Sequence, residues 1–231
     1  MITNPVWAVV IVSANEEWKT VACRYADRPQ QPTPFGTSHE MNVDGQRVLL
    51  MHGGWGKTAA AASTQYSISR WQPRLVVNLG TCGGLRGRIE QGEILLVDET
   101  WIYDVVERMG DAQEALEHYH VRLDLSWLRE PYPFSVRRAA LLSADQDIDP
   151  ARVSALMSRF NGVAADWESG AIAWVAQRNQ TPCLILRAVT DLVDDHDGEA
   201  YGRWDVFASN TRLVMQRLLD HLDAWLACSR L

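Results

Sequence analysis

The sequence predicts an α/β fold, a three-layer sandwich in which helices cover both faces of a mostly parallel, twisted sheet. Short apolar runs rich in β-branched residues alternate along the chain with segments of helical character, which is typical of strands joined by crossover helices. No linker, internal repeat or low-complexity tract divides the 231 residues. We therefore expect residues 1–231 to form a single domain.

Each expected strand is a short apolar run that ends in small or polar residues, as buried strands do. These runs lie at 7–12, 47–52, 74–79, 92–98, 139–143, 162–166 and 182–187. Asp44-Gly45 is a hairpin signal, and residues 29–34 are rich in turn formers. Residues 105–134 are charged and contain proline, so we expect an extended loop over one face.

Helices are expected at four places. The alanine-rich run 57–70 favours a helix that Pro73 ends, and Asp149 with Pro150 supplies an N-cap and a first-turn proline for a helix to Phe160. A further helix is expected at 168–178, and a long amphipathic helix at 204–228 closes the chain.

Composition excludes several classes of protein. The 22 Lys and Arg against 29 Asp and Glu give a net charge of −7, which disfavours a non-specific nucleic-acid binder. No apolar run reaches the ~18 residues of a membrane span, and no basic start of a signal peptide is present, so we expect a cytoplasmic protein. The four cysteines are scattered without a CxxC pair, which predicts reduced thiols and neither a disulfide nor a metal site.

Polar residues that directly follow the apolar runs are the candidate site residues, because ligands of such sheets lie beyond the carboxyl ends of the strands. They fall in the segments 13–17, 53–57, 80–84, 143–147, 166–168 and 187–191. Gly56-Lys57-Thr58 is not a phosphate-binding P-loop, since Met51 stands where its first glycine is required.

The other candidates each allow an ordinary structural interpretation when taken alone. Gly80 to Gly84 is either a ligand loop or a compact turn, and Glu168 is either a helix cap or a site residue. Arg187 and Asp191 could form a surface ion pair, and Glu17 could be a solvated first-turn glutamate.

The ordered set of these segments carries more information than any one of them. Gly54-Trp-Gly-Lys57, Leu79-Gly-Thr-Cys-Gly-Gly-Leu85, Gly92 to Asp98, Asp166-Trp-Glu-Ser-Gly170 and Arg187-Ala-Val-Thr-Asp191 follow one another along the chain. This set resembles the nucleoside phosphorylase/nucleosidase superfamily, and within it the bacterial methylthioadenosine/S-adenosylhomocysteine nucleosidases. The resemblance extends from about Val9 to Leu222 and implies the fold of that superfamily.

The resemblance implies a role for six positions. Asp191 matches the acid that protonates the purine at N7, and Arg187 matches an arginine that orients nearby carboxylates. Glu168 matches the glutamate that binds the ribose hydroxyls, and Thr81 with Gly83 matches the loop that faces the nucleophile and the sugar. Glu17 matches the glutamate that activates water, although a shift of one residue would place Trp18 there instead.

Four further positions are expected to bind substrate, and three of them depart from the family pattern. Gln146 and Asp147 lie in the segment that frames the base, with Asp147 where an aromatic residue usually stacks. Trp167 replaces a methionine and could supply the missing stacking surface, while Trp55 replaces a smaller residue that flanks the 5′ side of the sugar. These departures make adenine with a 5′ thioether a doubtful substrate.

We therefore expect a homodimeric enzyme that hydrolyses the N-glycosidic bond of a purine nucleoside without metal or organic cofactor. Water is the expected nucleophile, because Asn78 stands where related phosphorylases carry a phosphate-binding arginine and residues 13–17 contain no Lys or Arg. We expect the protein to bind neither nucleic acid nor a membrane. The alternatives are a purine nucleoside phosphorylase of the same fold and a nucleoside-binding protein without catalysis.

Overall fold

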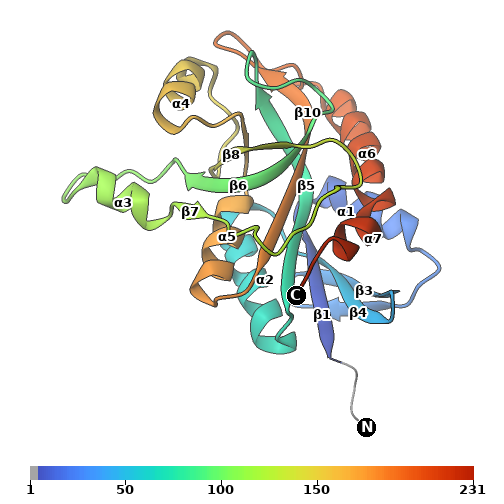
Figure 1. Ribbon diagram of the computed structural model, residues 1–231. Coiled ribbons are helices and arrows are strands. Elements are labelled where there is room, and N and C mark those ends of the chain that lie inside the picture. Colours follow the sequence, from blue (N-terminus) through green and yellow to red (C-terminus); the bar gives the residue numbers. More distant parts are fainter. Residues whose placement is uncertain (1–4) are drawn as a thin grey trace.

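The computed structural model describes residues 5–231, whose ten strands form one connected sheet in the order β10-β6-β8-β9-β5-β1-β4-β3-β2, with β7 paired to β6 (Figure 1). The strands are β1 (Val6–Val12), β2 (Gln30–Thr33), β3 (Gly36–Val43), β4 (Gln46–His52), β5 (Leu75–Leu85), β6 (Ile94–Ile102), β7 (Val121–Arg122), β8 (Arg137–Ser143), β9 (Ala164–Asp166) and β10 (Cys183–Val193). The helices are α1 (Asn15–Arg24), α2 (Gly56–Trp71), α3 (Ala112–His118), α4 (Val153–Phe160), α5 (Ser169–Arg178), α6 (Trp204–Asp220) and α7 (Leu222–Ala227).

The α/β fold is as predicted, and the sheet is mixed, so a mostly parallel sheet is not confirmed. Strands β1–β4, β1–β5, β5–β10, β6–β8 and β8–β9 pair in parallel, whereas β2–β3, β3–β4, β5–β9, β6–β7 and β6–β10 pair antiparallel. Tight turns enforce the antiparallel β2-β3-β4 edge. Because β10 pairs with both β5 and β6, strands β5, β10, β6, β8 and β9 close into a ring instead of an open sandwich.

Helices lie on both sides of β1, and alternate residues of this strand enter two different apolar clusters (Figure 1). Ala8, Val10 and Val12 pack in the cluster that also contains residues of α1, α6 and α7. Val9 and Ile11 pack in the cluster on the side of α2 and α5. This period-two alternation is what a strand buried on both faces requires, and it fixes the register of β1.

Two strands run further than their apolar runs predict. The sequence predicted strands that end at Leu79 and Arg187, with a ligand loop or a compact turn at 80–84, but both strands continue, paired with one another as far as Leu85 and Val193. A bulge between Val189 and Asp191 keeps the pairing in place. Gly80 allows the Arg187 side chain to lie against the backbone of β5, since a Cβ on residue 80 would lie 1.7 Å from the Arg187 guanidinium.

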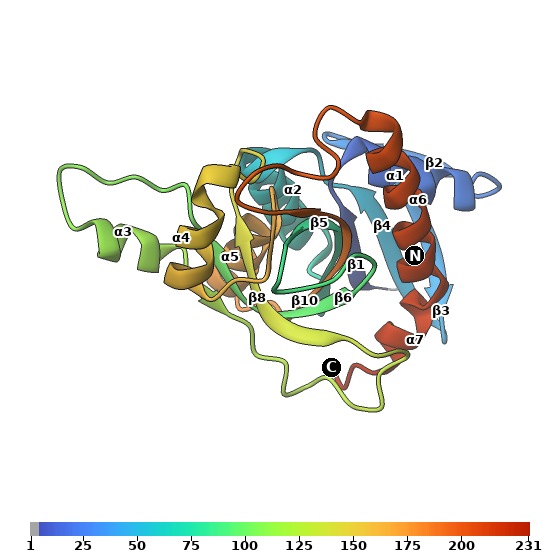
Figure 2. The same cartoon turned by 90° about the horizontal axis from the view of Figure 1, so that it is seen from above.

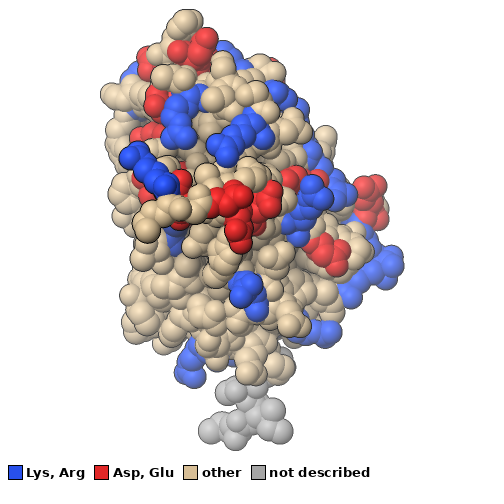
Figure 3. Space-filling view, turned by 90° about the vertical axis from the view of Figure 1, so that its left-hand side faces the viewer, with Lys and Arg blue, Asp and Glu red and all other residues tan. Residues whose placement is uncertain are grey.

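Other elements were predicted only in part. No range was predicted for helix α1 or strand β2. The hairpin signal at Asp44-Gly45 is confirmed by the turn between β3 and β4, and the expected C-terminal helix is interrupted at His221. The expected loop at 105–134 contains α3 and β7, and α3 projects away from the body of the molecule (Figure 2). On the face seen from the side of α3, acidic side chains gather across the middle with Lys and Arg on both sides of them (Figure 3).

Two further features of the structure are the state of the cysteines and the apolarity of the helices. All four cysteines are free, as expected from their spacing. Among residues 5–231, none of the helices combines the length and apolarity that crossing a bilayer requires.

Candidate active site

A cavity of ≈ 660 Å³ opens where β1, β5, β8, β9 and β10 end. Nine of the ten predicted site residues line it: Glu17, Trp55, Thr81, Gly83, Gln146, Asp147, Trp167, Glu168 and Asp191. The tenth, Arg187, lies beneath the cavity with its side chain fully buried. Residues that are far apart in the sequence therefore meet at the edge of the sheet that the strand pattern predicted.

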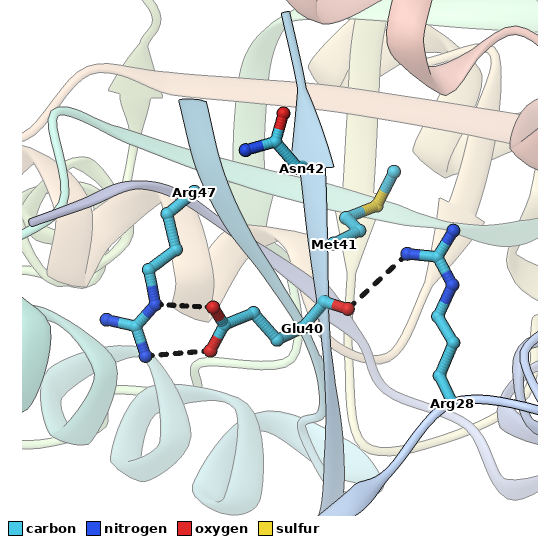
Figure 4. A pocket seen from close by; sticks show the side chains of 5 residues that line it. All are labelled: Arg28, Glu40, Met41, Asn42 and Arg47. Atoms are coloured by element: carbon cyan, nitrogen blue, oxygen red, sulfur yellow. Dashed lines mark hydrogen bonds and ion pairs between the residues drawn. The ribbon is translucent and has the colours of Figure 1, made fainter. Parts of the chain in front are cut away.

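A second cavity of ≈ 380 Å³ lies on the β3–β4 edge of the sheet and contains none of these residues (Figure 4). Its charged groups are already engaged with one another. The Glu40 carboxylate pairs with Arg47, and the Glu40 carbonyl accepts a hydrogen bond of 3.4 Å from Arg28. The larger cavity is therefore the candidate active site.

Arg187 organises the floor of this cavity. Its Nη2 lies 2.7 Å from Asp166 Oδ2 and 3.7 Å from Glu168 Oε2, and its Nη1 lies 3.5 Å from Glu17 Oε1. It also donates hydrogen bonds to Ser169 Oγ and Asn78 Oδ1 at 2.8 Å each and to the Thr81 carbonyl at 3.4 Å. Buried charges need this degree of pairing. The interpretation of Arg187 as one half of a surface ion pair with Asp191 is excluded.

Glu17 lies in the first turn of α1 and is 2% exposed. Its Oε1 accepts hydrogen bonds from the Thr81 backbone N–H at 2.6 Å and from Thr81 Oγ1 at 2.9 Å, and its Oε2 accepts one from the Ala14 N–H at 3.1 Å. Trp18, the alternative of the shifted register, does not line the cavity and stacks on His52 with ring centroids 5.3 Å apart. The geometry therefore favours Glu17 over Trp18, and Glu17 is not a solvated surface residue.

Glu168 directly precedes α5, yet its side chain does not cap that helix. Its Oε1 instead accepts a hydrogen bond of 3.1 Å from the Gly56 N–H at the start of α2. Burial raises the pKa of Glu168 to about 8; Arg187 opposes this increase, whereas the Asp166 and Glu17 carboxylates add to it. Glu168 can therefore hold a proton near neutral pH, where an ordinary glutamate is ionised.

Asp191 lies on the wall of the cavity, just after the bulge of β10. Its Oδ1 accepts a hydrogen bond of 2.6 Å from Thr190 Oγ1. Burial raises the pKa of Asp191; the Thr190 hydrogen bond opposes the shift, and the charges of Glu199 and Asp147 reinforce it. A carboxyl group with a raised pKa in a cavity is suited to donate a proton to a bound molecule.

Comparison with known proteins identifies the family. Residues 8–227 match the family model described as the Phosphorylase superfamily. The chain belongs to this superfamily. The resemblance predicted from the ordered motifs is thereby confirmed.

Sequence relatives and solved structures agree with this assignment. A 5′-methylthioadenosine/S-adenosylhomocysteine nucleosidase of Marinomonas sp. is 26% identical over 76% of this chain and 82% of its own length. One of Bacillus thuringiensis is 24% identical over 93% and 99%. The structure of futalosine hydrolase of Helicobacter pylori has a TM-score of 0.73 and 19% identity, covering 94% of this chain and 98% of that one. A nucleosidase of the same organism with bound 5′-methylthioadenosine has a TM-score of 0.72 and 16% identity, covering 94% and 99%.

The hydrogen bonds that hold the partners of Arg187 in place were not predicted from the sequence. Asp166 accepts hydrogen bonds from Ser143 Oγ at 2.6 Å and from Ser169 Oγ at 2.5 Å, in addition to its ion pair with Arg187. The Ser169 hydroxyl group contacts both Arg187 and Asn78. The run Asp166-Trp-Glu-Ser169 contained the signal, because three of its four residues are polar although they follow a buried strand.

A second group of charges holds the loop after β8 against α2. Asp104 pairs with Lys57 Nζ and accepts a hydrogen bond of 3.0 Å from the Asp145 N–H. The Asp145 carboxylate in turn accepts a hydrogen bond of 2.7 Å from the Lys57 N–H at the start of α2. Lys57 belongs to the Gly56-Lys57-Thr58 turn, which is not a P-loop. It therefore helps to position the loop that carries Gln146 and Asp147.

The remaining wall comes from residues that the sequence did not single out. Tyr201, Trp204 and Phe207 line the cavity from the loop after β10 and from α6. Arg203 is the one Lys or Arg among the described lining residues. Within residues 5–231, the structure contains no group of three His, Cys, Asp or Glu side chains placed to hold a metal ion.

Proposed function

We propose that this protein hydrolyses the N-glycosidic bond of a purine nucleoside and releases the free base and the sugar. One observation carries the proposal: Glu17, Glu168 and Asp191 line a single cavity, and a buried arginine lies beneath the first two. The names of the relatives, nucleosidase and hydrolase, support the same reaction class.

Asp191 is the proposed general acid. Departure of the purine places negative charge on the base, and a proton delivered to N7 neutralises it. The raised pKa of Asp191 supports this role, because the carboxyl group retains its proton closer to neutral pH. General acid catalysis of this kind contributes typically ~10²–10⁴-fold to the rate.

Glu168 is the proposed ligand of the ribose hydroxyls, and Glu17 the base that activates water. As the glycosidic bond breaks, positive charge develops on the sugar, and nearby carboxyl groups stabilise it through strong hydrogen bonds. Thr81 donates two hydrogen bonds to Glu17 and thereby orients it toward the cavity. Arg187 keeps both glutamates in place without itself reaching the cavity.

Water is the proposed nucleophile in preference to phosphate. Asn78 is fully buried, donates to the Ile11 carbonyl and accepts from Arg187, and it does not line the cavity where an anion would bind. The guanidinium of Arg187 is already committed to three carboxylates. Phosphate carries about −1.5 to −2 charges at neutral pH and would find an acidic cavity floor. We further propose a cytoplasmic homodimer that takes a small nucleoside as its substrate.

A screen of purine nucleosides for base release, with and without phosphate, tests the proposal. We expect release in phosphate-free buffer with free sugar as the product. Formation of a sugar 1-phosphate as the main product would identify a phosphorylase instead. Tight binding of a nucleoside without any base release would identify a binding protein.

A further inference from the structure

Trp18 directly follows Glu17 at the start of α1, and its indole packs on the hairpin of β3 and β4 instead of lining the cavity. Its Nε1 donates a hydrogen bond of 3.2 Å to Thr37 Oγ1, and its ring stacks on His52 with an interplanar angle of 6°. The ring centroid of His39 lies 5.8 Å from that of Trp18, with the two planes tilted by 33°. These contacts hold the turn of α1 that carries Glu17, the proposed base.

The three hairpin residues lie on the face of the sheet that α1 covers. The register of β3 and β4 places Thr37 opposite His52, with His39 two residues further along the same face of β3. The next residue on this face, Met41, belongs to the apolar cluster that contains Trp18. His39 is therefore a polar side chain within an otherwise largely apolar contact between α1 and the hairpin.

His39 is fully buried, and in the described part of the chain neither of its ring nitrogens has a hydrogen-bond partner. Buried polar groups are nearly always hydrogen-bonded, so two such nitrogens on one ring are unusual. Tyr25 of α1 lies with its ring centroid 6.1 Å away, and the register partners from β2 and β4 are Gln30 and Leu50. Glu40, the next residue, is on the opposite and exposed face of β3.

A proton on His39 would place a positive charge in this contact. Burial lowers the pKa of His39 below its ordinary value of 6.5, and the positive charge of Arg28 lowers it further. Burial also lowers the pKa of His52, although a hydrogen bond with the Ser13 backbone opposes that shift. A buried imidazolium without an acceptor is costly. Protonation should therefore draw His39 towards water and separate α1 from the hairpin.

We propose that His39 is a positioning residue that holds Trp18, and through it Glu17, in place only while its imidazole is neutral. Acid then releases the start of α1 and reversibly stops base release while the rest of the protein stays folded. Histidine suits this role because its charge changes close to neutral pH. The effect on base release rests on the proposed function, since it depends on Glu17 as the base.

The pH dependence of kcat in the wild type and in His39→Phe tests the inference, because phenylalanine keeps a ring at this position and cannot be protonated. The measurement is adenine release from 5′-methylthioadenosine, with each profile normalised to its own maximum. We expect the wild-type kcat to fall as the pH drops below 6.5. In His39→Phe the fall should occur at least about half a pH unit lower. His196→Phe is the matched control, since His196 is 87% exposed and does not line the cavity, and it should keep the wild-type profile.

Variants of Trp18 test the connection to Glu17 at neutral pH. Trp18→Leu should lower kcat by at least about tenfold and change KM by less than about threefold, because a misplaced base slows the reaction and Trp18 does not line the cavity. Trp18→Phe should retain most of kcat, since it keeps a ring against His52. A normal kcat in Trp18→Leu would show that Glu17 does not depend on this contact and would overturn the inference.

Hydrogen exchange of α1 relative to α5 in the same sample follows the helix without any substrate. Below pH 6.5, α1 should exchange faster relative to α5 in the wild type and in His196→Phe, but not in His39→Phe. Equal ratios in all three proteins would overturn the inference. If His39→Phe does not fold, His39→Met, which also cannot take up a proton, replaces it in both measurements.

The two measurements separate the positioning role from the proposed function. Faster exchange of α1 in acid that His39→Phe abolishes, without any base release at any pH, would refute the hydrolase and keep the positioning role. Base release with identical acid profiles in the wild type and His39→Phe would refute the positioning role and keep the hydrolase.

Discussion

The floor and the rim of the cavity are built in different ways. The floor consists of Glu17, Glu168 and Arg187, each at most 4% exposed and each held by hydrogen bonds or ion pairs to other parts of the chain. The rim contains Trp55 and Asp147, which are exposed. The floor matches the superfamily pattern and the rim departs from it. We therefore expect the reaction and the choice of substrate to depend on separate sets of residues.

Arg187→Met should cause the largest effect, because it leaves Glu17, Asp166 and Glu168 close together without their shared cation. Removal of one partner from a buried ion pair typically costs about 3–5 kcal/mol of unfolding free energy. Urea unfolding at pH 7 measures the loss. Arg203→Met at the rim is the control and should change stability by no more than about 0.5 kcal/mol. Equal stability of the two variants would show that the floor is not held together by this arginine.

Asp191→Asn should lower kcat by at least about 10²-fold while the protein remains folded, because an amide keeps the size of the side chain but has no acidic proton for N7. Base release and a urea unfolding curve on the same sample separate catalysis from stability. Asp195→Asn changes an exposed aspartate outside the cavity and should retain full activity. Near-normal turnover by Asp191→Asn would remove Asp191 from the reaction.

Glu168→Gln should change how stability depends on pH. The folded protein raises the pKa of Glu168 from 4.5 to about 8, so it binds a proton more strongly than the unfolded chain does. The corresponding stabilisation is complete below about pH 4.5 and is lost as the pH rises through about 8. Unfolding free energies at several pH values should therefore fall in the wild type by about 2 kcal/mol or more across this range, and less in the variant. If the unfolding free energies of the two proteins changed equally with pH, this would contradict the raised pKa of Glu168.

The same contrast explains what the sequence could predict. The floor was predictable because its residues follow apolar runs, and the carboxyl ends of parallel strands such as β1, β5 and β10 meet at the same edge of the sheet. The rim residues Tyr201, Trp204 and Phe207 were not predictable, since a loop and a helix bring them to the cavity through tertiary packing. Likewise, the extension of β5 through Gly80 to Gly84 was read as a loop, because glycines indicate turns unless a partner strand approaches closely.

Asp147→Phe should cause the smallest effect on stability and the most informative one on specificity. Asp147 is exposed on the cavity wall, in the segment that the family resemblance places beside the base. A carboxylate facing an apolar purine lacks a partner and costs about 1–3 kcal/mol, whereas a phenyl ring would stack on the base. We therefore expect kcat/KM for 5′-methylthioadenosine to increase by about tenfold, while Asp195→Phe, outside the cavity, leaves it unchanged. A wild-type kcat/KM for this nucleoside already at or above about 10⁴ M⁻¹s⁻¹ would show that Asp147 does not restrict the base site.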